Sequence, residues 1–207
     1  MKFTNQLKAI ALASALLVGN AMAQETIKIG VTGPFTGGSS SMGVSMRDGV
    51  RLATKEINEA GGIFGRKIQL VERDDEAQNA RGVAIAQELV NNEKIIADVG
   101  FINTGVALAA QRIYQDAKIP VFNNVATGTI ITKQFDKEPN NYIFRNAARD
   151  EIQAPMIVKE AIEKRGFKKV AILADSTNYG ELGKADLIKA LADKGITPVA
   201  VEKFNIK

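Results

Sequence analysis

The sequence predicts an α/β protein with two lobes, each built on a parallel sheet. Short apolar runs alternate with helical patterns along most of the chain, and strand starts recur at even spacing, near residues 67 and 95 and again near 142, 170 and 198. Such alternation is typical of parallel sheets covered by helices on both faces. A polar, turn-rich stretch interrupts the pattern at residues 133–146, so we expect the crossover between lobes near Tyr142–Asn146.

Residues 1–23 have the features of a cleavable secretion signal. Lys2 and Lys8 give a positive start, Ala9–Val18 is an apolar segment, and Ala21-Met22-Ala23 is a small-residue cleavage motif. The apolar segment is too short to cross a bilayer, which takes about 20 residues. A buried amino-terminal helix is the alternative. The chain has no cysteine, so its stability cannot rest on disulfides, and the combination predicts a soluble protein of a Gram-negative periplasm.

The first lobe is predicted to span residues 24–143. Strands are expected at 27–31, 67–71, 95–99 and 119–122, with helices at 45–60, 80–91 and 105–117. The first helix is expected to carry Val50, Leu52-Ala53 and Ile57 on one face. The third carries an apolar stripe at helical spacing, formed by Val106, Ala109, Ala110, Ile113 and Ala117.

The second lobe is predicted to span residues 144–207. A short strand at 142–145 leads into it, and a helical stripe runs from Ala154 to Ile162. Pro155 fits this helix only near the first turn, because proline lacks the N–H that helix interiors use. Further elements are expected at 170–174 (strand), 180–193 (helix) and 198–201 (strand). About three strands is few for a sheet, which usually has five or six, so this lobe is expected to be cut short.

The composition excludes several kinds of chemistry. The chain has neither histidine nor cysteine, so Ser-His-Asp, Cys-His and histidine-based metal sites are excluded. The turn Gly30–Pro34 lacks a dinucleotide fingerprint. Asp74-Asp75 offers a metal or acid–base pair, but adjacent residues at a strand end point apart, and capping or loop hydrogen bonds are favoured. No catalytic residue, metal or cofactor is predicted.

The charge gives little sign of a polyanionic partner. There are 27 basic and 23 acidic side chains, and two of the basic ones lie in the secretion signal. The basic residues are spread along the chain instead of forming a run. A mildly basic, solvated surface explains this pattern, and no nucleic-acid partner is predicted.

Polar turns rich in hydroxyl groups follow several predicted strands. They are Thr36–Met42, which includes Ser41, then Thr104, Thr127 and Ser176–Tyr179. Ligands of open α/β sheets bind at the carboxyl ends of the strands, and helix starts there offer free N–H groups to a carboxylate. We therefore predict one small-molecule site at these turns. Ordinary N-capping by Ser and Thr, and a packed surface role for Tyr179, are the alternatives.

Short motifs, taken in order behind a secretion signal, resemble one family. The chain resembles the periplasmic branched-chain amino-acid (Leu/Ile/Val) binding proteins, which are type I substrate-binding proteins of ABC transporters. The matching pieces are Ile27-Lys28-Ile29-Gly30, Gly33-Pro34, Ala60-Gly61-Gly62-Ile63, Asp74-Asp75, Val99-Gly100, Ala126-Thr127, Phe144-Arg145 and Asn178-Tyr179-Gly180.

The resemblance implies two Rossmann-like lobes that close on an amino acid or other small carboxylate and deliver it to a membrane permease as a monomer. It implies that Thr104 and Thr127 meet the ligand carboxylate, that the Val125 carbonyl takes the ammonium group, and that Tyr179 contacts the ligand from the second lobe. Mature family members are nearly twice as long, so an acidic contact for the ammonium group is expected beyond Lys207.

The chain also departs from the family pattern. Met42 stands at the end of the first loop, after Ser41, where amino-acid binders often have an aromatic residue, and this loop looks about two residues longer. Asn103 stands beside Thr104 where small hydroxyl residues are common. These residues join the predicted site and leave the ligand's side chain open, since the same fold also takes aromatic acids, amides and urea-like ligands.

Two other functions are considered beside a transport receptor. A ligand-sensing receptor domain shares the fold and would show a membrane span in a longer reading frame. A secreted α/β hydrolase would need a nucleophile with a base, and no spacing in the chain suggests a Ser–Lys or carboxylate arrangement.

Overall fold

The computed structural model describes residues 25–206, so the predicted secretion signal lies outside the described residues. Two parallel sheets organise the chain, one with the strand order β2-β1-β3-β4-β5 and one formed by β6 and β7. The prediction of an α/β protein with parallel sheets is confirmed. Strands of the larger sheet are β1 (Ile27–Gly33), β2 (Ile68–Asp74), β3 (Ala97–Gly100), β4 (Val121–Asn123) and β5 (Ile143–Arg145); the smaller has β6 (Ala171–Asp175) and β7 (Ala200–Phe204).

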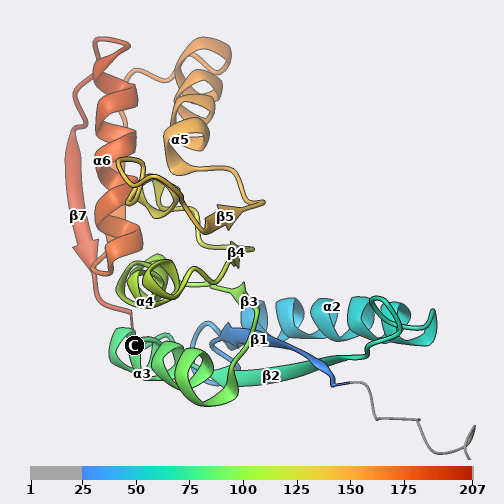
Figure 1. Ribbon diagram of the computed structural model, residues 1–207. Helices are drawn as coiled ribbons and strands as arrows, with labels where there is room; N and C mark the ends of the chain where they lie inside the picture. Colours follow the sequence, from blue (N-terminus) through green and yellow to red (C-terminus); the bar gives the residue numbers. More distant parts are fainter. Residues whose placement is uncertain (1–24, 207) are drawn as a thin grey trace, which may run out of the picture.

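The helices form two arms that meet at α4 (Figure 1). One arm holds α2 and the strands β1 and β2, and the other holds α5, α6 and β7. Helices α4 and α6 are in contact where the arms meet. The helical elements are α2 (Ser40–Glu59), α3 (Asn79–Glu88) with η1 (Leu89–Glu93), α4 (Thr104–Ala117), η2 (Thr129–Thr132), α5 (Asp150–Val158) with η3 (Lys159–Lys164), and α6 (Asn178–Ala192).

The main core lies between the larger sheet and the helices α3 and α4. Apolar side chains from both helices pack there against strand residues, and all are buried. Of the stripe predicted for the third helix, Val106 and Ala110 are fully buried, Ala109 and Ile113 are half-buried, and Ala117 is exposed. Burying such side chains is the main source of stability in a chain without disulfides. A smaller core joins α5 and α6 to β6 through Ala154, Val158, Ile172, Ala190 and Leu191.

The apolar face predicted for the first helix is largely exposed. Leu52 and Ile57 are 57% and 40% exposed, and Gly43 is the buried residue of α2. Helix α2 contacts β1 and β2 on the face of the sheet opposite α3 (Figure 1), but these two side chains stay at the surface. On the strands beyond α2, Phe122 and Phe144 stack on each other, with ring centroids 5.4 Å apart, and both remain partly exposed.

Three predicted helix positions are corrected by the structure. Helix α2 begins at Ser40 instead of residue 45, and α6 begins at Asn178 instead of residue 180. The serines and asparagine at these starts have side chains that favour turns, but packing overrides that local preference. Pro155 lies inside α5, which begins at Asp150, and so falls past the first turn where it was expected.

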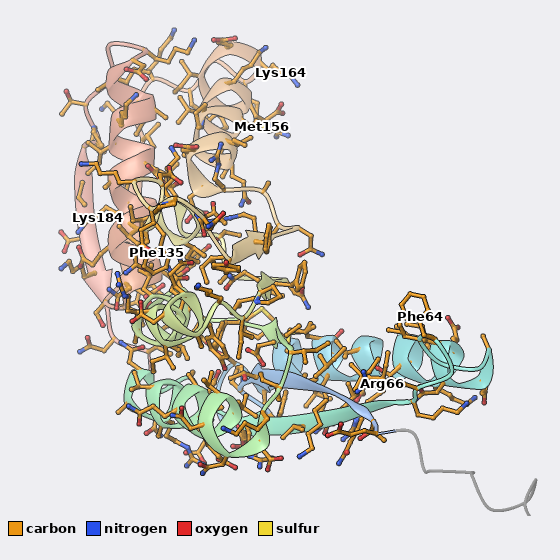
Figure 2. All side chains as sticks on the ribbon, viewed as in Figure 1. Phe64, Arg66, Phe135, Met156, Lys164 and Lys184 are labelled. Atoms are coloured by element: carbon orange, nitrogen blue, oxygen red, sulfur yellow. The ribbon has the colours of Figure 1, made fainter. Side chains whose placement is uncertain are left out.

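Other apolar side chains stay at the surface, away from both cores. Figure 2 shows Phe64 projecting at the turn between α2 and β2, and Met156 on the outer side of α5. Phe64 is 94% exposed and has a positive φ of 52°. No helix within residues 25–206 is long and apolar enough to cross a membrane.

Gly43 allows α2 to approach the loop that follows β1. A Cβ atom at this position would lie 2.0 Å from the Pro34 carbonyl oxygen. We expect Gly43→Ala to lower the free energy of unfolding by about 1–3 kcal/mol, because the backbone must move to admit the methyl group. Urea unfolding followed by circular dichroism measures the change.

A matched control for this prediction is available on the same helix. A Cβ atom at Gly49 would have no neighbour within 4 Å. Gly49→Ala should therefore raise stability by about 0.5–1 kcal/mol, since alanine is the better helix former. Equal stability of Gly43→Ala and the unmodified protein would contradict the close approach.

Candidate ligand-binding site

A cavity of about 310 Å³ lies where the carboxyl ends of β1, β3 and β4 face the start of α6. Its volume is at the lower end of the range of small-molecule pockets. The structure brings six of the predicted site residues together around it: Met42, Asn103, Thr104, Val125, Thr127 and Tyr179.

Ser41 is the predicted site residue that does not line this cavity. It lies in the first turn of α2 and faces a neighbouring, more open hollow of about 650 Å³ between α2 and the ends of β4 and β5. Met42 and Val125 line both spaces. The Ser41 prediction fails for this cavity because the helix begins earlier than expected and turns that side chain toward the next hollow.

Thr104 is the first residue of α4 and is 1% exposed. Its hydroxyl oxygen accepts a hydrogen bond from the Gly128 N–H at 3.3 Å. The N-cap position belongs to Asn103, whose side chain makes no capping bond. The hydroxyl of Thr104 and the free N–H groups of the first turn of α4 are therefore at the cavity wall together, as anion binding requires.

Asn103 joins this wall to the loop that follows β1. Its Nδ2 donates to the Ser39 hydroxyl at 3.4 Å, and its Oδ1 is buried with no partner among the described residues. The same loop is tied down by Asp74, which accepts hydrogen bonds from the Phe35 N–H at 2.8 Å and the Thr36 hydroxyl at 2.6 Å. Asp74 therefore serves as a loop anchor, in line with the use favoured from the sequence.

The loop after β4 brings Val125 and Thr127 to the cavity. The Thr127 carbonyl accepts hydrogen bonds from Arg145 Nη1 and from the Asp150 N–H, each at 3.0 Å. The Asp150 carboxyl is buried beside this loop. Burial raises its pKa, the hydroxyl of Thr127 counteracts this in part, and the negative charge of Asp186 adds to the rise. The loop is thus held from behind by the last residue of β5 and the first residue of α5.

The opposite wall comes from the end of β6 and the start of α6. Tyr179 is 50% exposed, and burial raises its pKa, with the negative charges of Asp150 and Asp175 adding to the rise. Asn178 lies close to Gly105 of α4, because a Cβ atom at Gly105 would be 2.9 Å from its Oδ1. The amino ends of α4 and α6 therefore lie in contact, and both contribute residues to the cavity lining.

Five further residues line the cavity, and none of them was singled out from the sequence. Ser39 and Thr177 lie within the predicted turns Thr36–Met42 and Ser176–Tyr179, and Asp175 ends the strand before the second of these turns, so the strand-end rule offered a signal for all three. Ile102 and Ile206 carry no such signal, because an apolar side chain in a turn or near the end of the chain has no distinctive pattern. Those lining residues are Ser39, Ile102, Asp175, Thr177 and Ile206.

The acidic groups of the described residues do not form a metal centre. No group of three or more His, Cys, Asp or Glu side chains in residues 25–206 is placed to hold an ion. Asp75, the second member of the predicted pair, accepts a hydrogen bond from the Ala77 N–H at 2.8 Å and is buried.

Sequence comparison relates the whole described region to one family. Residues 26–206 match the family described as periplasmic binding protein. An amino acid binding protein of Pseudomonas aeruginosa is 34% identical over 91% of this chain and 50% of its own length. The leucine-, isoleucine-, valine-, threonine- and alanine-binding protein of the same organism is 33% identical over 94% of this chain and 51% of its own. The chain thus spans about half the length of these relatives.

Solved structures give the same relation. A periplasmic binding protein type 1 from Bordetella pertussis matches with a TM-score of 0.79 at 30% identity, over 87% of this chain and 49% of its own. A branched-chain amino acid transporter substrate binding protein from Streptococcus pneumoniae, in complex with isoleucine, matches with a TM-score of 0.77 at 30% identity, over 87% and 50%. A solute binding protein of an ABC transporter from Rhodopseudomonas palustris, in complex with 3,4-dihydroxy benzoic acid, matches with a TM-score of 0.75 at 30% identity, over 87% and 47%.

The fold has the type I arrangement expected from the sequence, and the resemblance stated from the sequence motifs is confirmed. This family consists of substrate-binding proteins and not of enzymes, so the hydrolase alternative is set aside. The chain belongs to the periplasmic binding protein family.

Proposed function

We propose that the protein is a periplasmic substrate-binding protein that captures an amino acid or another small carboxylate between two lobes, residues 24–143 and 144–207, and delivers it as a monomer to the permease of an ABC transporter. The observation that carries the proposal is the meeting of Thr104, Thr127 and Tyr179 around one cavity at the amino ends of α4 and α6. The secretion signal predicted from the sequence supports the periplasmic location.

The chemistry of the cavity favours a ligand with a carboxylate. The first-turn N–H groups of α4 and the positive end of its dipole attract negative charge, and the Thr104 hydroxyl adds a directed donor. Met42, Ile102, Tyr179 and Ile206 add apolar surface that suits an aliphatic or aromatic side chain. The remaining wall is polar and includes Ser39, Asp175 and Thr177. The relatives that bind isoleucine and dihydroxybenzoic acid have ligands that share the carboxylate.

Ligand capture would shift the two lobes toward a closed form. A ligand that touches both the α4 and α6 sides fits the closed form better than the open one, and this difference in fit drives the shift. Excluding water from the cavity strengthens the charge-assisted hydrogen bonds to the carboxylate.

Isothermal titration calorimetry tests the proposal. The titrants are L-leucine, L-isoleucine, L-valine and 3,4-dihydroxybenzoate, with L-leucinol as the control that lacks a carboxylate. We expect heat of binding with at least one of the acids and none with L-leucinol. A folded protein that binds no member of the panel would contradict the proposal, and equal binding of L-leucine and L-leucinol would contradict the carboxylate assignment.

Removing either threonine hydroxyl is expected to weaken binding. Thr104→Val and Thr127→Val keep the shape of the side chain but remove the hydroxyl group, and each should raise the Kd for the bound acid about tenfold, the effect of one charge-assisted hydrogen bond. Titration of both variants measures the change. Thr54→Val, on α2 and outside the cavity lining, is the matched control and should leave the Kd unchanged. An unchanged Kd in both site variants would contradict the assignment of Thr104 and Thr127 to the ligand site.

A further inference from the structure

One peptide unit links the segment between β5 and α5 to Thr104. The carbonyl of Thr127 accepts hydrogen bonds from Arg145 Nη1 and the Asp150 N–H, both at 3.0 Å. The N–H of the same peptide unit, which belongs to Gly128, donates to the Thr104 hydroxyl oxygen at 3.3 Å. A trans peptide is planar, so its C=O and N–H point in opposite directions. Whatever fixes the carbonyl therefore aims the N–H at Thr104.

Arg145 is the side chain that holds this carbonyl and the next one. It ends β5, the last strand of the larger sheet, and its Nη2 donates to the Gly128 carbonyl at 2.8 Å. A planar guanidinium with two donors in fixed directions sets the orientation of two consecutive peptide units, which a single ammonium group cannot do.

The surroundings of Arg145 show that these carbonyls are its main partners. Its side chain is partly buried, burial lowers its pKa, and its Nε is buried without a partner. No carboxylate of residues 25–206 forms an ion pair with it. The positive charge of Arg149 also lowers the pKa of Arg145, while the negative charges of Asp150 and Glu151 oppose this. The direct hydrogen bonds of the guanidinium therefore go to the two carbonyls, which replace the water lost on burial.

The orientation of the peptide decides what Thr104 can offer to a ligand. A threonine hydroxyl has one O–H donor and two acceptor lone pairs. The Gly128 N–H occupies one lone pair, and no acceptor among the described residues takes the hydroxyl proton. That proton is therefore unclaimed within the described residues, and Thr104 is one of the residues that line the cavity.

We propose that Arg145 is a positioning residue for the ligand site: it turns the Thr127–Gly128 peptide so that Thr104 presents its hydroxyl proton to the bound carboxylate. The proposal deepens the proposed function and rests on it only for the identity of the ligand. It also connects the segment between β5 and α5 to the carboxylate end of the site, because Arg145 and Asp150 hold the same carbonyl from either end of residues 146–149.

Hydrogen exchange at the Gly128 amide, followed by NMR, tests the positioning without any ligand. Arg145→Met should speed this exchange by about tenfold or more, and Thr104→Val should do the same because it removes the acceptor. The matched control is Arg149→Met, which removes an arginine of the same segment that pairs with Glu151 at 2.9 Å. This control should leave the Gly128 amide protected.

Hydrogen exchange at the amides of the smaller core, formed by α5, α6 and β6, shows whether Arg145→Met lowers stability in general. These amides should keep their protection in Arg145→Met. Arg145→Lys keeps the positive charge but not the two fixed donors of the guanidinium, so the Gly128 amide should exchange at an intermediate rate. This variant replaces Arg145→Met in the test if Arg145→Met does not fold. Unchanged Gly128 exchange in the arginine variants, with faster exchange in Thr104→Val, would overturn the proposal.

A double-mutant cycle tests the consequence for binding. If Arg145 acts through Thr104, then adding Arg145→Met to Thr104→Val should raise the Kd for L-leucine by less than twofold beyond Thr104→Val alone. If the increase in Kd of the double variant equals the product of the increases of the two single variants, Arg145 does not act through Thr104. If the unmodified protein binds neither L-leucine nor 3,4-dihydroxybenzoate, the proposed function fails, while the exchange of Gly128 still decides the role of Arg145.

Discussion

Asp98→Asn is expected to stabilise the protein above neutral pH and to remove much of the pH dependence of its stability between pH 4 and 7. Asp98 lies in β3 and is fully buried, with Oδ1 accepting a hydrogen bond from the Thr32 hydroxyl at 3.1 Å. Burial raises its pKa to about 7; the Thr32 and Tyr114 hydroxyls oppose the rise, and the negative charge of Asp75 adds to it.

The direction of the effect follows from proton binding in the two states. The unfolded chain releases the Asp98 proton near pH 4, whereas the folded protein keeps it until about pH 7. Between these values the folded state binds more protons, so raising the pH favours unfolding. The stability present below pH 4 is lost progressively up to pH 7, by at most about 4 kcal/mol. Asparagine resembles the protonated acid and never bears the buried charge.

Urea unfolding of both proteins at a series of pH values from 4 to 8 measures this difference. The gap between Asp98→Asn and the unmodified protein should widen as the pH rises and level off above pH 7. Asp75→Asn should act in the same direction with a smaller effect, because burial raises the pKa of Asp75 to about 6. Parallel stability curves for Asp98→Asn and the unmodified protein would contradict the buried ionisation.

The elements predicted correctly from the sequence are those whose pattern is local. The apolar run before Gly100 and the helical stripe after Thr104 each lie within one element, so hydrophobic periodicity suffices to place β3 and α4. The meeting of Thr104 and Thr127 at one cavity was predictable for a related reason. In a parallel sheet all carboxyl ends lie at one edge, so the turns after β3 and β4 must be neighbours.

The features missed from the sequence depend on packing between distant segments. Asp98 reads as one polar residue in a short strand, and its complete burial follows from the position of α4, which places Tyr114 beside it. Ile206 lines the cavity because β7 lies beside β6 and runs toward the site, a pairing that no local pattern encodes.

Gly128→Ala is expected to raise the Kd for the bound carboxylate by at least about a hundredfold, more than the loss of one hydroxyl group. The backbone at Gly128 has a φ of −47° and a ψ of 126°, which any residue adopts, so the effect does not come from conformational strain. It comes from contact, because the added Cβ would lie 2.4 Å from Thr104 Cγ2 and 3.2 Å from its Oγ1. The loop and α4 must separate, which displaces Thr104 and Thr127 together.

The second-site variant Thr104→Ser separates this steric cause from any other. Serine lacks the Cγ2 atom that meets the new methyl group but keeps the hydroxyl that accepts the Gly128 N–H. The double variant Gly128→Ala with Thr104→Ser should therefore bind L-leucine within about tenfold of the unmodified protein, because the clash is relieved while the hydroxyl group is kept. Gly49→Ala, beside the neighbouring hollow, is the control and should bind normally. Binding is measured by calorimetry. If Thr104→Ser does not restore binding, the effect of Gly128→Ala does not come from its contact with the Thr104 side chain.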